Sequence, residues 1–123
     1  MSGPVLSRQE AERRGRRAET LAAWWLTLRG YRVVARNLRT PPSEVDILAL
    51  RGRALVVVEV KARESWQACE ESLDWHTRRR LDRAARWLSE THPLADGREV
   101  RIDAVHVVGW RVRHIADAWK HNE

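Results

Sequence analysis

Apolar positions in the first quarter of the chain recur at a helical spacing. A Ser-x-x-Glu capping box at Ser7 and Glu10 predicts a helix over about residues 8–29, and Gly30 is the expected stop. The apolar stripe of this helix is expected to comprise Ala11, Ala18, Leu21, Ala22, Trp25, Leu26 and Leu28. Glu19 lies at the edge of that stripe.

The next segments have the spacing of strands. A β-branched run predicts a strand at 31–37, two prolines predict a loop at 39–43, and strands follow at 44–50 and 54–63. Gly52 at the first central position of residues 51–54 predicts a type II′ hairpin turn. The pattern over 65–73 is ambiguous.

The last third of the chain returns to a helix and then to strands. Leu81, Ala84, Ala85 and Leu88 predict one apolar helix face over about 74–91, and the opposite face carries Arg79, Arg83 and Arg86. Strands are expected at 100–108 and 110–114, with a helical turn at 117–120. The order α-β-β-β-α-β-β predicts an α/β fold with a mixed sheet flanked by helices, and 123 residues predict a single domain spanning 1–123.

Composition narrows the class of protein. Hydrophobic residues at 43% exclude a disordered chain, and interspersed charges at 33% exclude a membrane span. The N-terminus lacks a secretory apolar stretch, so a cytoplasmic location is expected. One cysteine excludes an internal disulfide and a Cys-based zinc site, and the five histidines lack zinc-binding spacing. Any metal is therefore expected to be held mainly by oxygen ligands.

The charge of the chain indicates the type of partner. A net charge of +6 favours an anionic partner, with nucleic acid ahead of a membrane surface. Of the 23 basic residues only Lys61 and Lys120 are lysines. Lysine is a compact charge with a tunable pKa, whereas arginine is a wide planar fork, so Lys61 indicates a site that requires lysine.

The hairpin brings two carboxylates together. If the turn holds Gly52 and Arg53, Asp46 lies directly opposite Glu59, and Lys61 lies on the same face. Opposed carboxylates repel unless a cation compensates, and Mg²⁺ takes one or two carboxylates together with phosphate oxygens. Asp46 and Glu59 are thus candidate ligands for Mg²⁺ or Mn²⁺. Lys61 is a candidate for positioning the attacking water or stabilising phosphoryl charge.

These residues resemble the D…E-x-K core of the PD-(D/E)xK nuclease superfamily, although Val45 replaces the namesake proline. Over residues 15–119 the chain is similar to the YraN family, uncharacterised protein family 0102. The similarity is carried by Gly15 and Glu19, 30–31, 36–37, 44–47, 58–63, 80–81 with Ala84, and 101–103.

The resemblance implies a restriction-endonuclease-like fold, a catalytic core of Asp46, Glu59 and Lys61, and Glu19 as an additional acid near the metal. Two positions depart from the family pattern. Ser43 stands where a glycine is usual, and Thr77 stands where a lysine is common. The second departure would remove a phosphate contact.

Each candidate also has a simpler interpretation. Asp46 and Glu59 would otherwise form a salt-bridge cluster with Lys61 and an arginine, and Glu19 would pair with Arg16 or a neighbouring arginine. Asp103 is expected to anchor a strand through an arginine, and Glu44 to be a solvated turn residue. The seven tryptophans are expected to lie mostly in the core, with one or two near 65–75 available to stack on a base. The candidate nucleic-acid-binding residues are Arg63, Arg78, Arg79, Arg80 and Arg83, for which the simpler interpretation is a solvated helix face.

The sequence supports three functional hypotheses, in order from the most to the least supported. The first is a metal-dependent endonuclease that hydrolyses phosphodiester bonds in DNA. The second is a non-catalytic nucleic-acid-binding protein that retains the nuclease fold, and the third is a protein-interaction module for an acidic partner. The oligomeric state is not determined by the sequence, and a homodimer is compatible with it.

Overall fold

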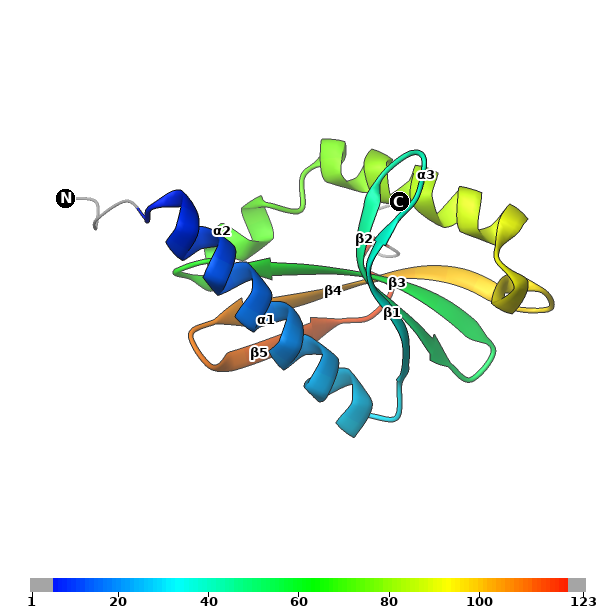
Figure 1. The fold of residues 1–123 in the computed structure, drawn as a ribbon, viewed down its shortest axis with the longest axis horizontal. Coiled ribbons are helices and arrows are strands. Elements are labelled where there is room, and N and C mark those ends of the chain that lie inside the picture. The colour runs from blue at the N-terminus through cyan, green and yellow to red at the C-terminus, as the bar shows by residue number, and fades with distance from the viewer. Residues whose placement is uncertain (1–5, 120–123) are drawn as a thin grey trace.

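The protein is built on one five-stranded sheet, seen in a computed structural model that describes residues 6–119 (Figure 1). The strands lie in the order β1-β2-β3-β4-β5, and only β3 and β4 pair in parallel. Helix α1 lies over one face, and α2 and α3 lie over the other. The predicted mixed sheet flanked by helices is therefore confirmed.

Helix α1 (Arg8–Leu28) begins at the predicted capping box. The Ser7 hydroxyl oxygen accepts a hydrogen bond from the Glu10 N–H at 3.1 Å, which satisfies one of the free donors of the first turn. After the last turn Gly30 adopts φ +91°, a conformation that favours glycine. The predicted bounds are correct to within one residue.

The strands β1 (Arg32–Arg39), β2 (Glu44–Arg51) and β3 (Ala54–Ala62) form two consecutive hairpins. Gly52 has φ +57°, as a type II′ turn requires at its first central position. Arg51 pairs with Ala54, and the ladder continues to Ile47 opposite Val58. The predicted register is confirmed over these residues.

The parallel pair requires a crossover, which the helices supply. After β3 come α2 (Trp66–Glu71), α3 (Trp75–Thr91) and a short 3₁₀ helix, η1 (Pro93–Ala95). The antiparallel strands β4 (Glu99–Val108) and β5 (Arg111–Ile115) complete the sheet. The ambiguous segment is thus mostly helical, and residues 116–119 form a turn. Lys120, the end of the expected helical turn, lies outside the described residues.

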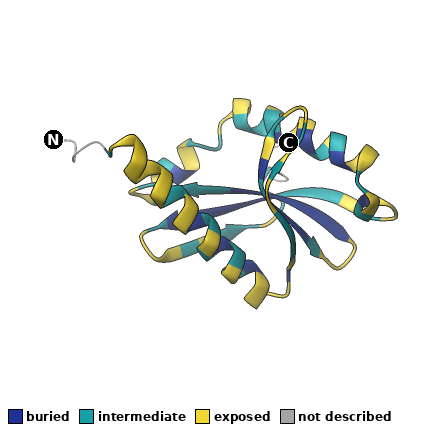
Figure 2. Ribbon diagram, viewed as in Figure 1, coloured by how far each residue is buried: buried dark blue, intermediate teal, exposed yellow. Residues whose placement is uncertain are grey.

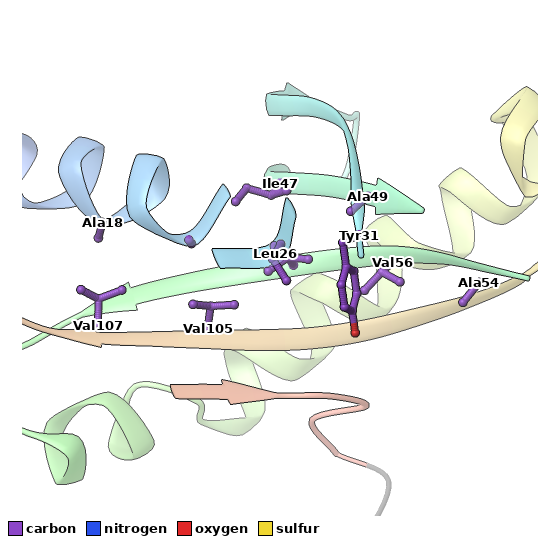
Figure 3. Close-up of a cluster of buried hydrophobic side chains, with 11 residues drawn as sticks. Ala18, Leu26, Tyr31, Ile47, Ala49, Ala54, Val56, Val105 and Val107 are labelled. Carbon is purple, nitrogen blue, oxygen red and sulfur yellow. The ribbon is translucent and has the colours of Figure 1, made fainter. Parts of the chain in front are cut away.

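Two apolar clusters enclose the sheet, one on each face (Figure 2). Beneath α1, Ala18, Ala22 and Leu26 pack on small side chains such as Val56 and Val105 (Figure 3). On the other face Leu81, Ala84 and Leu88 of α3 pack on β2 and β3. Because β3 is covered on both faces, its sequence is a nearly continuous run of apolar residues.

The expectation that most tryptophans lie in the core is wrong. Trp24, Trp75 and Trp110 are exposed, and Trp25, Trp66, Trp87 and Trp119 are only partly buried. Valine, leucine, isoleucine and alanine side chains supply nearly all of the core, and the close approach of α1 through two alanines leaves no room for an indole. Leu28, expected in the apolar stripe of α1, is also exposed.

Asp103 joins four separate parts of the chain. Its Oδ1 accepts from Arg101 Nε and from the Asp117 N–H, both at 2.9 Å, and its Oδ2 lies 2.8 Å from His114 Nε2 and 3.2 Å from the Tyr31 hydroxyl. Burial raises the pKa of this carboxyl, but the hydrogen bonds it accepts lower the pKa by more than burial raises it. The pKa of Asp103 therefore lies below its usual value. The predicted anchoring by an arginine is confirmed.

Candidate active site

A pocket of about 600 Å³ opens where β3 reaches its carboxyl end. The predicted residues Asp46, Glu59 and Lys61 line it together, with Glu44 at the start of β2. The N-terminal half of α1 closes one side through Ala11, Arg14 and Gly15, and Arg80 reaches in from α3. The β2–β3 hairpin and two helices distant from it in the sequence therefore build one concave site.

Asp46 lies where the β2–β3 ladder stops. Its Oδ2 accepts a hydrogen bond from the Val60 N–H at 2.8 Å, and the paired residues end one position earlier, at Ile47 and Val58. The carboxylate therefore takes the backbone donor that another ladder bond would use. The register of these pairs continues to Asp46 opposite Glu59, where the backbone pairing has ended, and the two side chains meet in the same pocket.

Glu59 is buried, with 3% of its surface exposed. Its Oε2 lies 3.2 Å from Lys61 Nζ and 2.5 Å from an Arg80 guanidinium nitrogen. A buried carboxylate needs such partners because desolvation disfavours its charge. The Glu59–Lys61 contact confirms that both side chains lie on one face of β3.

Asp46 has a different electrostatic environment from Glu59. Among the described residues, no lysine or arginine forms a salt bridge with Asp46. Burial and then the charge of Glu59 raise the pKa of Asp46 from 3.8 to about 8, and the hydrogen bond from Val60 opposes this effect. The protonated form of Asp46 is therefore favoured near neutral pH when no metal is bound.

The donor set fits a hard divalent cation. Two carboxylates meet in a partly solvated pocket, and the charge of one disfavours ionisation of Asp46, so a divalent cation such as Mg²⁺ or Mn²⁺ would find there both oxygen ligands and negative charge. Within residues 6–119 no three His, Cys, Asp or Glu side chains form a complete metal cage. The remaining ligands would then be waters and substrate oxygens, which is the usual arrangement for Mg²⁺.

Glu19 approaches the site from α1 without lining the pocket. Its Oε1 is buried and has no hydrogen-bond partner in the described part of the chain. Burial raises the pKa of Glu19, Arg36 and Asn37 lower it, and the nearby charges of Glu44 and Glu59 raise it again. The structure therefore places Glu19 close enough to Glu59 to feel its charge but outside the lining of the pocket, and its catalytic role stays a prediction.

Arg80 is the residue whose position the sequence analysis missed. The sequence predicts nucleic-acid binding for Arg80, whereas its guanidinium contacts Glu59 and also donates to Ser43 Oγ at 2.8 Å. The sequence does contain a pattern that indicates this position. Arg80, Ala84 and Leu88 are each four residues apart, which places Arg80 on the same side of α3 as two buried residues.

The other predicted arginines lie around the pocket or on the solvent side of α3. Arg63 lines the pocket, and Arg79 and Arg83 are exposed. Arg78 is partly buried and lies 3.8 Å from Asp82. Their binding of nucleic acid stays a prediction.

The two departures from the family pattern have clear structural positions. Ser43 has no positive φ, so glycine is not required there, and its hydroxyl joins the turn to Arg80. The Thr77 N–H donates to the Asp74 carboxylate at 2.9 Å, and its hydroxyl donates to the Ser72 carbonyl at 3.1 Å. Thr77 therefore stabilises the start of α3 instead of presenting a cation.

The sheet order, the flanking helices and the crossover define an α/β protein with the restriction-endonuclease-like fold. The model of the uncharacterised protein family UPF0102 matches residues 18–107, and the chain belongs to this family. A UPF0102 protein of Parvibaculum lavamentivorans is 51% identical over 89% of this chain and 84% of its own length. Another, from Paramagnetospirillum magneticum, is 42% identical over 95% of each chain. No helix among residues 6–119 is long and apolar enough to cross a membrane.

Proposed function

We propose that this protein is a metal-dependent nuclease that hydrolyses phosphodiester bonds in DNA. The observation that carries the proposal is the convergence of Asp46, Glu59 and Lys61 in one basic-rimmed pocket. Asp46 and Glu59 would hold Mg²⁺ or Mn²⁺, which, when bound, polarises the scissile phosphate and lowers the pKa of an attacking water.

The protein residues have separable tasks in this proposal. Lys61 holds its ammonium group 3.2 Å from Glu59, inside the pocket, where it can orient a water or stabilise charge on the phosphate. Arg14 and Arg63 line the same pocket and can neutralise flanking phosphates. Arg80 fixes the Glu59 carboxylate and links it to the turn at Ser43.

The activity test uses DNA of three shapes, single-stranded, duplex and branched, with Mg²⁺ or Mn²⁺. We expect cleavage by the native chain, and a loss of about 10²-fold or more in Lys61→Ala and in Glu59→Gln. Glu90→Gln, an exposed change on the far end of α3, is the matched control and should keep full activity. Cleavage that persists in Lys61→Ala would contradict the proposed role of this lysine.

The metal site has a separate test that needs no turnover. Mn²⁺ should raise the unfolding temperature of the native chain, because a ligand that binds only the folded state stabilises it. The Asp46→Asn/Glu59→Gln double variant should show no such rise. An equal rise in both proteins would place the metal elsewhere.

A second function is favoured by the cations already beside Glu59. Arg80 and Lys61 neutralise this carboxylate without a metal, and Thr77 supplies no phosphate-binding cation at the start of α3. A non-catalytic nucleic-acid-binding protein would bind DNA in EDTA and never cut it. In that case alanine at both Asp46 and Glu59 would leave binding unchanged or tighten it, because repulsion of phosphate is removed.

A further inference from the structure

Two of the exposed tryptophans lie close together outside the carboxylate pocket. Trp24 on α1 is 64% exposed, and Trp110 in the β4–β5 turn is 73% exposed. Together they line one hollow of about 430 Å³, whose other walls are Arg16, Arg17, Thr20 and Leu21. Large apolar side chains that lie together at this exposure indicate a binding surface, because most of their apolar area is not buried by folding.

This hollow is connected to the carboxylate pocket by shared walls. An intermediate hollow shares Arg14, Ala62 and Arg63 with the carboxylate pocket. It shares Arg17 and Leu21 with the tryptophan hollow. The three hollows therefore adjoin one another in a row along α1, and we name this row the α1 track.

The side chains along the track follow one stripe of the helix. Arg14, Arg17, Leu21 and Trp24 are spaced at i, i+3, i+7 and i+10, so they lie in a row. From Gly15 at the pocket to Trp24 the helix rises about 14 Å, the length of roughly four stacked nucleotides at 3.4 Å each.

The charge of the track selects the partner. Arginines recur along it, and Glu64, the acidic residue in its walls outside the carboxylate pocket, lies 3.9 Å from Arg14. The guanidinium of Arg17 lies 5.6 Å from the Trp110 ring, so a cation and an aromatic surface meet at the far end. A second copy of this chain would bring the same arginines against each other, which charge repulsion disfavours.

We propose that the α1 track binds an unpaired DNA strand that runs from the carboxylate pocket to a stacking platform made by Trp24 and Trp110. The arginines would follow the phosphates, and the indole rings would stack on bases. A duplex cannot use this platform, because its base faces are already covered by neighbouring base pairs. The inference rests on the proposed function in taking the carboxylate pocket as the place of cleavage, and it names single-stranded or partly unpaired DNA as the substrate.

The exposed Trp75 provides a matched control. It is 59% exposed but lies on α3, across the sheet from α1, and its ring stacks on His76 at a centroid distance of 3.8 Å. Trp66, the other tryptophan near 65–75, packs against the Arg113 guanidinium at 4.3 Å. Neither lines a wall of the track.

The experiment measures binding by fluorescence anisotropy in EDTA, so cleavage cannot contribute. The probes are a labelled single strand of about 20 nucleotides, longer than one binding site, and the duplex of the same sequence. We expect Trp24→Ala and Trp110→Ala each to weaken single-strand binding about five-fold or more. Duplex binding should change less than two-fold, and Trp24→Phe should restore part of the loss because phenylalanine can also stack.

Salt dependence separates stacking from charge. The tryptophan variants should keep the native slope of affinity against salt concentration, because stacking releases no counterion. Arg17→Gln should reduce that slope by about 0.7 for the single phosphate contact it loses. Unchanged urea midpoints would show that these exposed substitutions leave the fold intact.

Several results would overturn the inference. Equal losses on single strand and duplex, or an equal loss in Trp75→Ala, would show that the platform does not read unpaired bases. A native dimer that dissociates in the tryptophan variants, with DNA binding unchanged, would assign the surface to a second copy. If the native chain binds single strands through both tryptophans but never cuts with either metal, the proposed nuclease function fails, and only the binding of an unpaired strand by the α1 track stands. If instead the native chain cuts DNA and neither tryptophan variant changes that cleavage, the proposed nuclease function stands and the stacking platform is refuted.

Discussion

Asp46→Asn should stabilise the metal-free protein at neutral pH, although Asp46 is a candidate metal ligand. In the native chain this carboxyl is held beside Glu59 and accepts the Val60 N–H. Asparagine has nearly the same shape, keeps an oxygen for Val60 and has no charge. The variant therefore removes the repulsion and keeps the hydrogen bond.

The magnitude and the pH dependence follow from the pKa of Asp46. It is raised from 3.8 to about 8, so the folded state resists an ionisation that the unfolded chain undergoes freely. At 1.36 kcal/mol for each pKa unit, this destabilises the native chain by at most about 4 kcal/mol at pH 7, and solvent in the pocket should reduce it to roughly 2 kcal/mol. A group with a raised pKa contributes stability below its unfolded pKa and loses it as the pH rises. The advantage of Asp46→Asn should therefore be small near pH 4 and grow up to about pH 8.

Urea unfolding in EDTA at about pH 4.5 and pH 7.5 measures this effect. A gain of 2 kcal/mol should raise the urea midpoint at the higher pH by about 1 M. Asp96→Asn, which alters an exposed aspartate, is the control and should shift the midpoint little at either pH. A gain that does not depend on pH, or a loss of stability at pH 7.5, would refute the proposed repulsion.

Three further predictions concern stability, each measured by urea unfolding. Asp103→Asn should destabilise the fold by about 3 kcal/mol, because it weakens a buried network around Arg101 and His114, and native stability should fall below about pH 4 because the pKa of Asp103 is depressed. His106→Leu should stabilise by about 1 kcal/mol, because both ring nitrogens are buried without partners among the described residues. Burial lowers the pKa of His106, so the native chain should lose stability as the pH falls below about 6.5 and the variant should lose less. Gly30→Ala should cost about 1 kcal/mol or more, because Gly30 has φ +91° and an added Cβ would lie 2.5 Å from the Arg51 guanidinium. Midpoints that move in the opposite direction would contradict each of these.

The elements and the carboxylate site followed largely from local rules. The start of α1 depends on Ser7 and Glu10, which are neighbours on one turn. The register of the β2–β3 hairpin depends on the turn at Gly52, so the approach of Asp46, Glu59 and Lys61 needed only one hairpin and its side-chain alternation. Interactions within a few residues of each other can be read from sequence because no distant packing decides them.

Contacts between distant elements were decided by the tertiary structure. The pattern of α3 did not reveal that Arg80 reaches Glu59, since this depends on how α3 packs across β2 and β3. The end of the ladder at Asp46 depends on competition between a side chain and the backbone for the Val60 N–H. Hydrophobicity alone predicts that the tryptophans lie in the core. In the structure α1 approaches the sheet closely through Ala18 and Ala22, and Trp24 is left outside the core. The sequence determined which residues are apolar or charged, and the packing distances between helices and sheet determined which of them remain available for binding.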